Sequence, residues 1–193
     1  MNFIVQTIDT LGYAGVFGLM ALESCGIPIP SELIMPFSGF LVEAGTMNFT
    51  IVVLMGTFGN LIGSLVAFWI ARKGGRPLIE KYGKYILISG KDLDMADRWF
   101  QKHGNLTVFL GRLLPVVRTY ISFPAGIAQM DWKRFSIYTF LGALPWSVLF
   151  VYLGTKMGAH WQLIEQKLHE FNLLIAFLVL AAVVIYVYRH LKK

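Results

Sequence analysis

Hydrophobic positions in this chain form long uncharged blocks separated by polar segments. The blocks at residues 51–71, 135–155 and 173–188 each come near the length that crosses the hydrocarbon core of a bilayer. A shorter block, residues 12–22, predicts a first span if it borrows turns from the segment before it. These blocks predict an all-α polytopic membrane protein.

Two further apolar stretches are interrupted by proline and carry charge. Residues 24–45 contain three prolines, and residues 104–128 contain Pro115 between two arginines. Proline removes a backbone hydrogen bond and bends or ends a helix. Folded as a hairpin, each arm has about eleven residues and reaches about 16 Å, which is half of a bilayer. We therefore predict two re-entrant hairpins, whose irregular backbone must be buried in protein or line a water-filled cavity.

The segments between these blocks are polar or amphipathic. Residues 1–11 place apolar side chains at helical spacing, which fits either an interfacial amphipathic helix or the first turns of the next span. Residues 72–103 form a polar loop in which apolar positions predict a surface helix. Its positive charge is typical of a cytoplasmic face that touches anionic lipid, and we prefer this interpretation over a nucleic-acid surface.

Lysine and arginine are distributed unevenly over the loops. Residues 72–103 hold eight of them and residues 189–193 hold three, whereas residues 39–50 hold none and residues 156–172 hold two. The positive-inside rule therefore places the large loop and both termini in the cytoplasm, with the chain in the cell membrane. The number of membrane crossings agrees with this orientation only if both proline-broken stretches return to the side of the membrane from which they entered. The charges thus support the hairpins independently of the prolines.

A weak internal repeat with a shift of 83 residues runs through the chain. It aligns four pairs of identical residues, Met47–Met130, Gly59–Gly142, Lys73–Lys156 and Gly75–Gly158. Each unit is then one re-entrant hairpin followed by one transmembrane helix, with the two units inverted in the membrane and flanked by transmembrane and amphipathic helices. Inverted repeats with broken helices that meet near the midplane are typical of transporters.

The composition agrees with one integral membrane domain over residues 1–193. Of the residues, 56% are hydrophobic and 15% are charged, whereas a soluble domain carries about 25% charged residues. The N-terminus has no lysine or arginine before its apolar run, so we expect no cleavable signal. The single Cys25 excludes an intrachain disulfide and a cysteine metal cluster. We expect no cofactor and no metal.

Small residues recur every four positions in the block at residues 51–71. Gly59, Gly63, Ala67 and Ala71 form a stripe suited to close helix packing, either within the monomer or in a homodimer. We interpret Asn60, beside the stripe, as a packing hydrogen bond rather than a ligand.

Four ionisable residues fall within or beside the predicted membrane segments: Glu23, Glu32, Arg112 and Arg118. An arginine in the bilayer costs about 2.5–3.5 kcal/mol on insertion scales, so these residues must pair or face a water-filled cavity. An acidic hairpin opposite a basic one provides the pairing. One interpretation is a purely structural network, but buried ion pairs stabilise poorly compared with apolar packing. The other is that both arginines bind an anionic group, with phosphate first because a guanidinium forks onto its oxygens.

An enzymatic function fits the sequence poorly. The histidines lie in loops or at ends without metal-ligand spacing, at His103, His160, His169 and His190. No nucleophile and base are visibly paired. A lipid phosphatase acting through histidine needs one beside the arginines, and His103 is the single candidate. We therefore predict a transporter and not an enzyme.

The charged motifs resemble those of a known family. GRLLPVVRT at Gly111–Thr119, followed by PAG at Pro124–Gly126, resembles the signature of the DedA family, also called SNARE-associated Golgi or VTT-domain proteins. LES at Leu22–Ser24 and PIPSE at Pro28–Glu32 match its N-terminal acidic segment. The resemblance covers nearly the whole chain. Many members have an aspartate where this chain has Glu32.

The resemblance implies two inverted re-entrant hairpins, cytoplasmic termini and movement of lipid between leaflets. It implies Glu23 and Glu32 as the acidic positions and Arg112 and Arg118 as the basic ones. Bacterial members include translocases for undecaprenyl phosphate, and some members need the proton motive force, so the expected partners are this lipid and protons. Alternatives that stay open are a phosphatidylethanolamine or general phospholipid flippase or scramblase, and a membrane scaffold with structural ion pairs.

Overall fold

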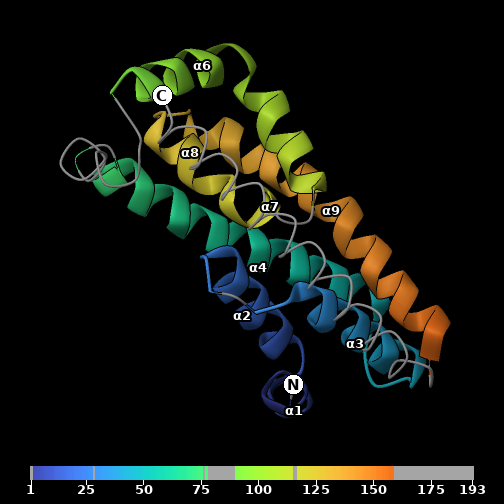
Figure 1. The fold of residues 1–193 in the computed structure, drawn as a ribbon. Helices are drawn as coiled ribbons and strands as arrows, with labels where there is room; N and C mark the ends of the chain where they lie inside the picture. The colour runs from blue at the N-terminus through green and yellow to red at the C-terminus, as the bar shows by residue number, and fades with distance from the viewer. Residues whose placement is uncertain (1, 28, 76, 78–89, 115–116, 159–193) are drawn as a thin grey trace, which may run out of the picture. The chain divides into compact units, whose positions relative to one another are not determined.

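The computed structural model describes residues 2–27, 29–75, 77, 90–114 and 117–158 (Figure 1). Every secondary-structure element in these residues is helical, which confirms the all-α prediction for this part of the chain. The described helices all belong to one compact unit, Met1–Gly158. The predicted span at residues 173–188 lies outside the described residues.

Two long helices form the frame of this unit. Helix α4 covers Phe49–Ile70 and continues as the π-helical turn η1, Ala71–Gly75, and helix α9 covers Trp132–Met157. Both are long and apolar enough to cross a membrane, as predicted from the blocks they contain. They pack against each other and run in opposite directions (Figure 1).

The two long helices begin in the same way, with positions related by the predicted shift of 83. The side chain of Asn48 accepts a hydrogen bond from the backbone N–H of Ile51 at 3.3 Å, and that of Asp131 accepts one from the N–H of Arg134 at 2.9 Å. A side-chain oxygen at this position satisfies one of the free N–H groups of the first helical turn. Each cap therefore fixes where its helix starts.

The outer sides of both long helices carry large exposed apolar side chains. On α4 these side chains recur every three or four positions, at Ile51, Leu54, Phe58, Ile62, Val66 and Trp69. On α9, Ile137, Leu141, Val148 and Tyr152 are exposed in the same way. Exposed apolar stripes of this length are expected of helices whose solvent is lipid.

The first hairpin is not where the sequence placed it. Residues 24–45 do not fold back on themselves, because Ser31–Glu43 is one helix, α3, with Pro36 inside it. The first arm is instead helix α2, Tyr13–Ser24, which at about 1.5 Å per residue is too short to be a full span. Pro30 directly precedes α3, where proline starts a helix because no N–H donor is needed there. The prediction of a span at residues 12–22 is therefore wrong as well.

The N-terminal segment is a helix of its own. Helix α1, Asn2–Leu11, is separated from α2 by Gly12, whose φ of 57° and ψ of −129° form a conformation that side chains with a Cβ rarely adopt. Ile4 and Ile8 are buried, whereas Phe3 and Leu11 are exposed. Of the two predicted alternatives, the structure therefore has a separate helix, and its interfacial position stays a prediction.

The second broken stretch begins inside a longer helix. The predicted surface helix and the first arm at residue 104 are one continuous helix, α6, Gly90–Leu113. Short helices α7, Val117–Tyr120, and α8, Ser122–Ile127, follow after a break, and α8 packs back against α6. The chain thus reverses between α6 and α8. The predicted boundary between a loop ending at residue 103 and a hairpin beginning at residue 104 is therefore wrong, because α6 continues through both residues.

Glycines bring the first arm of each hairpin against the long helix that follows it. Gly59 of α4 lies against Phe17 and Met20 of α2, and Gly142 of α9 lies against Phe109 and Arg112 of α6. The two glycines correspond at a shift of 83, and their partners on the first arms, Phe17 with Phe109 and Met20 with Arg112, correspond at a shift of 92. Helices can approach this closely because glycine has no side chain.

The second arm of each hairpin crosses to the long helix of the other unit. Gly39 of α3 and Gly126 of α8 each lie against three residues of a long helix, and the two sets correspond at a shift of 83. The set is Val151, Gly154 and Thr155 for Gly39, and Phe68, Ala71 and Arg72 for Gly126. The two units therefore share one packing pattern.

The small-residue stripe is used up within the monomer. Gly59 and Gly63 contact α2, and Ala71 contacts Gly126 of α8. Ala67 is fully buried as well. Helices of the same chain therefore cover the stripe, which serves packing within the monomer, and a homodimer through another surface stays a prediction.

Candidate anion-binding site

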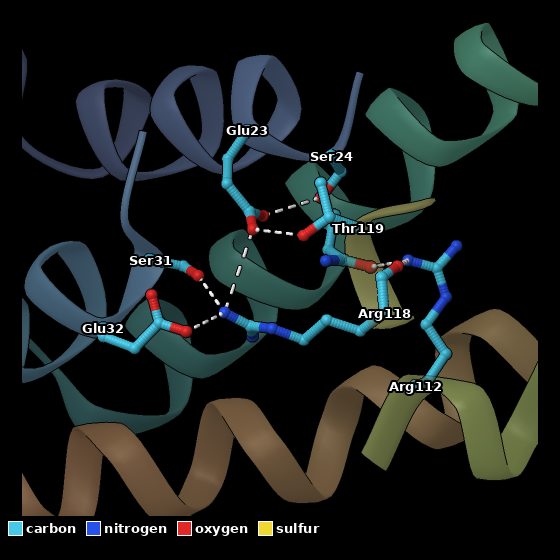
Figure 2. Close-up of polar contacts among 8 residues, drawn as sticks. Glu23, Ser24, Ser31, Glu32, Arg112, Arg118 and Thr119 are labelled. Carbon is cyan, nitrogen blue, oxygen red and sulfur yellow. Dashed lines mark hydrogen bonds and ion pairs between the residues drawn. The ribbon is translucent and has the colours of Figure 1, made fainter. Parts of the chain in front are cut away.

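The structure brings all four predicted site residues together where the two hairpins meet (Figure 2). Glu23 lies at the end of α2 and Glu32 in the first helical turn of α3, so the two flank the connection between the arms of the first hairpin. Arg112 lies in the last turn of α6 and Arg118 in α7, on either side of the second break. The charges that the sequence placed 80 or more positions apart thus share one site.

Arg118 connects the basic hairpin to the acidic one. Its Nη2 donates a hydrogen bond to Oε1 of Glu32 at 2.7 Å and lies 3.8 Å from Oε1 of Glu23. The same nitrogen contacts Oγ of Ser31. The guanidinium also lies over the ring of Trp146, 5.1 Å from its centroid, and the residue is only 3% exposed. One buried arginine therefore faces two carboxylates on one side and an aromatic ring on another.

Hydroxyl groups fix Glu23 in place. Thr119 donates to its Oε1 and Ser24 to its Oε2, each at 3.1 Å. Thr119 belongs to the basic hairpin and Ser24 to the acidic one. The carboxylate of Glu23 is thus buried and held from both hairpins, whereas Glu32 is partly accessible.

Arg112 has a different role from the one predicted by charge pairing. Its Nη1 donates to the backbone oxygen of Arg118 at 2.6 Å and its Nη2 to Oγ of Ser122 at 2.9 Å, which ties α6 to α7 and α8. Its other acceptor is Oδ1 of Asn60, 3.4 Å from Nη1. These acceptors are uncharged, and Arg112 is 1% exposed. The predicted pairing of the acidic with the basic hairpin therefore rests on Arg118, while Arg112 holds the second turn closed.

A small cavity adjoins both arginines on the side of the long helices. Its volume of about 10 Å³ is near what one water molecule needs. Its lining combines donors and apolar groups from α2, α4, α6, α7 and α9: Met20, Asn60, Arg112, Arg118, Ala143, Trp146 and Ser147.

Several residues of the site were not predicted. Ser24, Ser31 and Thr119 stand inside the quoted motifs, directly beside a charged residue, and this adjacency was the available signal. Asn60 was interpreted as a packing hydrogen bond, and its partner is an arginine of the site. Trp146 gave no signal, because tryptophan in an apolar helix has many structural uses.

His103, the candidate for a histidine-based phosphatase, lies on α6 nine residues before Arg112. At 1.5 Å per residue this places the two about 13 Å apart along the helix. Its ring lies against Trp99, 4.8 Å between centroids. Within the described part of the chain, no three of His, Cys, Asp and Glu are grouped so that they could hold a metal ion.

Comparison with known proteins decides the family. Residues 29–156, about two thirds of the chain, match the VTT domain. The chain belongs to the VTT-domain (DedA) family. This VTT-domain protein is therefore a membrane protein, as its sequence predicts.

Similar proteins include one from Bacillus subtilis named undecaprenyl phosphate transporter A, which is 42% identical over 98% of this chain and 93% of its own length. A Staphylococcus aureus protein of the same name is 28% identical over 100% of this chain and 97% of its own length. A Lactococcus lactis protein named alkaline phosphatase-like protein is 33% identical over 89% of this chain and 82% of its own length. No solved structure matches the chain.

Proposed function

We propose that this protein moves a lipid with a phosphate headgroup, undecaprenyl phosphate first, between the leaflets of the cell membrane. The observation that carries the proposal is the buried guanidinium of Arg118 at the meeting point of the two hairpins. A charged arginine inside a membrane protein marks a pathway or a ligand. The names of the Bacillus and Staphylococcus relatives support the choice of lipid.

Each hairpin is proposed to be re-entrant, so that the two units form an inverted repeat in the membrane. The matching glycine contacts, in which the long-helix residues of the two units correspond at a shift of 83, support this proposal. The antiparallel course of α4 and α9 (Figure 1) supports it too, because inverted units must cross the membrane in opposite directions. The loop at residues 72–103 is then cytoplasmic, as the lysine and arginine count predicts. With α2 as a hairpin arm, α4, α9 and the predicted span at residues 173–188 make three crossings, so the predicted cytoplasmic side is kept for the C-terminus and not for the N-terminus.

The carboxylates are proposed to compete with the lipid phosphate for Arg118. Glu32 already occupies one terminal nitrogen of that guanidinium, and Glu23 lies beside it. A phosphate that takes over Arg118 leaves both carboxylates without their cation, and a buried carboxylate without a partner is expensive. Proton uptake by one of them removes this cost and is the proposed coupling of transport to protons.

Two other functions have some support from the same contacts. The exposed edge of Glu32 suits an ammonium group, which favours a flippase or scramblase for phosphatidylethanolamine or other phospholipids. The direct pairing of Arg118 with Glu32 favours a scaffold whose ion pairs are structural.

Liposomes that contain the purified protein test the three functions. Undecaprenyl phosphate is placed in the inner leaflet, and an external phosphatase reports how fast the lipid becomes accessible outside, with and without a pH gradient. Faster exposure with the protein supports the proposal, and a dependence on the gradient supports proton coupling. Movement of phosphatidylethanolamine in place of the polyprenyl lipid would favour the phospholipid flippase, and movement of neither would favour the scaffold.

Exchanging the paired charges separates a carrier from a scaffold. We expect the double variant Glu32→Arg with Arg118→Glu to lose transport and to keep much of the thermal stability lost by the single variant Glu32→Arg. The exchanged pair retains its mutual attraction, but the position that bound phosphate now carries a negative charge. Transport is measured in the liposomes and stability by heating in detergent. Recovery of full transport in the double variant would contradict the proposal.

A further inference from the structure

Two buried N–H groups beside the small cavity have no hydrogen-bond acceptor among the described residues. They are Nε of Arg112 and the indole Nε1 of Trp146. Both residues line the same cavity, from α6 and α9 respectively. A buried donor without an acceptor is destabilising, so two such donors on residues that line one cavity favour an acceptor oxygen in it.

The remaining polar lining of the cavity also favours an anion. Arg118 contributes its guanidinium, and Asn60 and Ser147 contribute an amide and a hydroxyl. Glu23 and Glu32 do not line the cavity. The cavity therefore combines two guanidinium groups and an indole N–H with no carboxylate in its wall, and its volume of about 10 Å³ fits an oxygen-sized group.

Trp146 also breaks the likeness between the two units. Its position corresponds at the shift of 83 to Gly63, which lies against the backbone of α2. In the second unit an indole replaces that glycine and lies beside Arg118. In the first unit the hairpin packs on the long helix without an indole at this position. We infer that packing alone does not require Trp146 in the second unit.

We propose that this cavity is the subsite for a phosphate oxygen and that Trp146 is a substrate-binding residue. The indole Nε1–H of Trp146 and the Nε–H of Arg112 donate to oxygens of a phosphomonoester group, while Arg118 provides charge. The phosphate oxygen is thereby held beside Arg118 in a cavity that neither Glu23 nor Glu32 lines. This inference rests on the proposed transport of a phosphate lipid and adds the long helix α9 to the binding site.

The test compares two tryptophans of the same helix. Trp146→Phe keeps an aromatic ring beside Arg118 and removes the N–H, and Trp132→Phe makes the same change at an exposed position at the start of α9. A hydrogen bond to a charged group implies a change of about tenfold or more. We expect Trp146→Phe to raise the amount of undecaprenyl phosphate needed for half-maximal transport by that factor, and Trp132→Phe to leave it unchanged.

A second variant places an anion in the cavity. Asn60→Asp puts a carboxylate oxygen where Oδ1 now accepts from Arg112. The fixed negative charge pairs with the arginine and repels phosphate, so we expect transport to fall about tenfold or more while the protein unfolds at no lower temperature than the wild type. A merely structural asparagine would not combine retained stability with lost transport.

Inorganic phosphate separates failure of this inference from failure of the proposed function. If the wild type transports the lipid and Trp146→Phe equals Trp132→Phe, the cavity holds a structural water only and the inference is overturned. If no lipid moves but inorganic phosphate raises the unfolding temperature of the wild type and not of Trp146→Phe, the subsite binds free phosphate. The inference then stands and the proposed transport fails. If phosphate raises neither and no lipid moves, both fail.

Discussion

Replacing Arg118 by lysine is expected to reduce lipid transport about a hundredfold while leaving the protein folded. One nitrogen of the guanidinium contacts both Ser31 and Glu32, and its Cζ lies over the ring of Trp146, 5.1 Å from the centroid. Lysine keeps the positive charge between the carboxylates but is a single point donor that cannot fork onto phosphate. Losing two charge-assisted hydrogen bonds accounts for an effect of about this size. Transport in liposomes and unfolding in detergent are the two measurements.

Lysine is a sharper substitution here than alanine. Alanine would leave the buried Glu23 and the partly accessible Glu32 without a cation. Breaking a buried pair costs about 3–5 kcal/mol, so lost transport would also follow from lost structure. Arg72→Lys is the matched control. The Nη1 of Arg72 donates to the backbone oxygen of Met130 at 2.9 Å, and Arg72 is not one of the four charged residues of the site. Equal transport by Arg118→Lys and Arg72→Lys would show that the guanidinium binds no phosphate.

The charged residues of the site were predictable because ionisable side chains are rare in apolar segments. Glu23, Glu32, Arg112 and Arg118 stood out for that reason alone, and the structure brings all four together. Their individual partners were not predictable. Arg112 and Arg118 carry the same charge, yet one holds uncharged acceptors of its own hairpin and the other faces both carboxylates. Which arginine faces the carboxylates depends on how the chain changes direction after the end of α6.

The boundaries of the first hairpin failed for a local reason. Proline both starts helices and interrupts them, and the sequence does not say which. Pro30 starts α3, and Pro36 is accommodated inside it. The break in the second stretch was predicted more accurately. It lies between Arg112 and Arg118, and the chain must bend between them for both side chains to reach the same site.

The internal repeat was weaker in the sequence than in the structure. Four identical pairs supported it, whereas the caps at Asn48 and Asp131 and the contacts of Gly39 and Gly126 follow the same shift without being identities at every position. Backbone contacts tolerate different side chains, so a shared packing pattern outlasts the sequence likeness. Glycine recurs at Gly59 and Gly142, where it sets how closely the helices approach, whereas Trp146 stands where the first unit has Gly63.

Gly63 is the position where one added methyl group should damage the fold most. A Cβ there would overlap the backbone of Ala21, and a backbone carbonyl cannot rotate away as a side chain does. Helix α2 must therefore move off α4, and because Ala21 is two residues before Glu23, the carboxylate moves with it. We expect Gly63→Ala to destabilise the protein by about 1–3 kcal/mol, the usual range for an overpacked core, and to lower transport.

Gly18→Ala is the matched comparison, because it makes the same change on α2 where a Cβ meets open space. Alanine is the better helix former by about 1 kcal/mol, so this variant should unfold at the same temperature as the wild type or a higher one. Heating both variants in detergent and following the folded fraction by size-exclusion chromatography gives the comparison. Equal stability of Gly63→Ala and Gly18→Ala would mean that α2 does not depend on close contact with α4. The position of Glu23 would then have to be set by Thr119 and Arg118 alone, from the opposite hairpin.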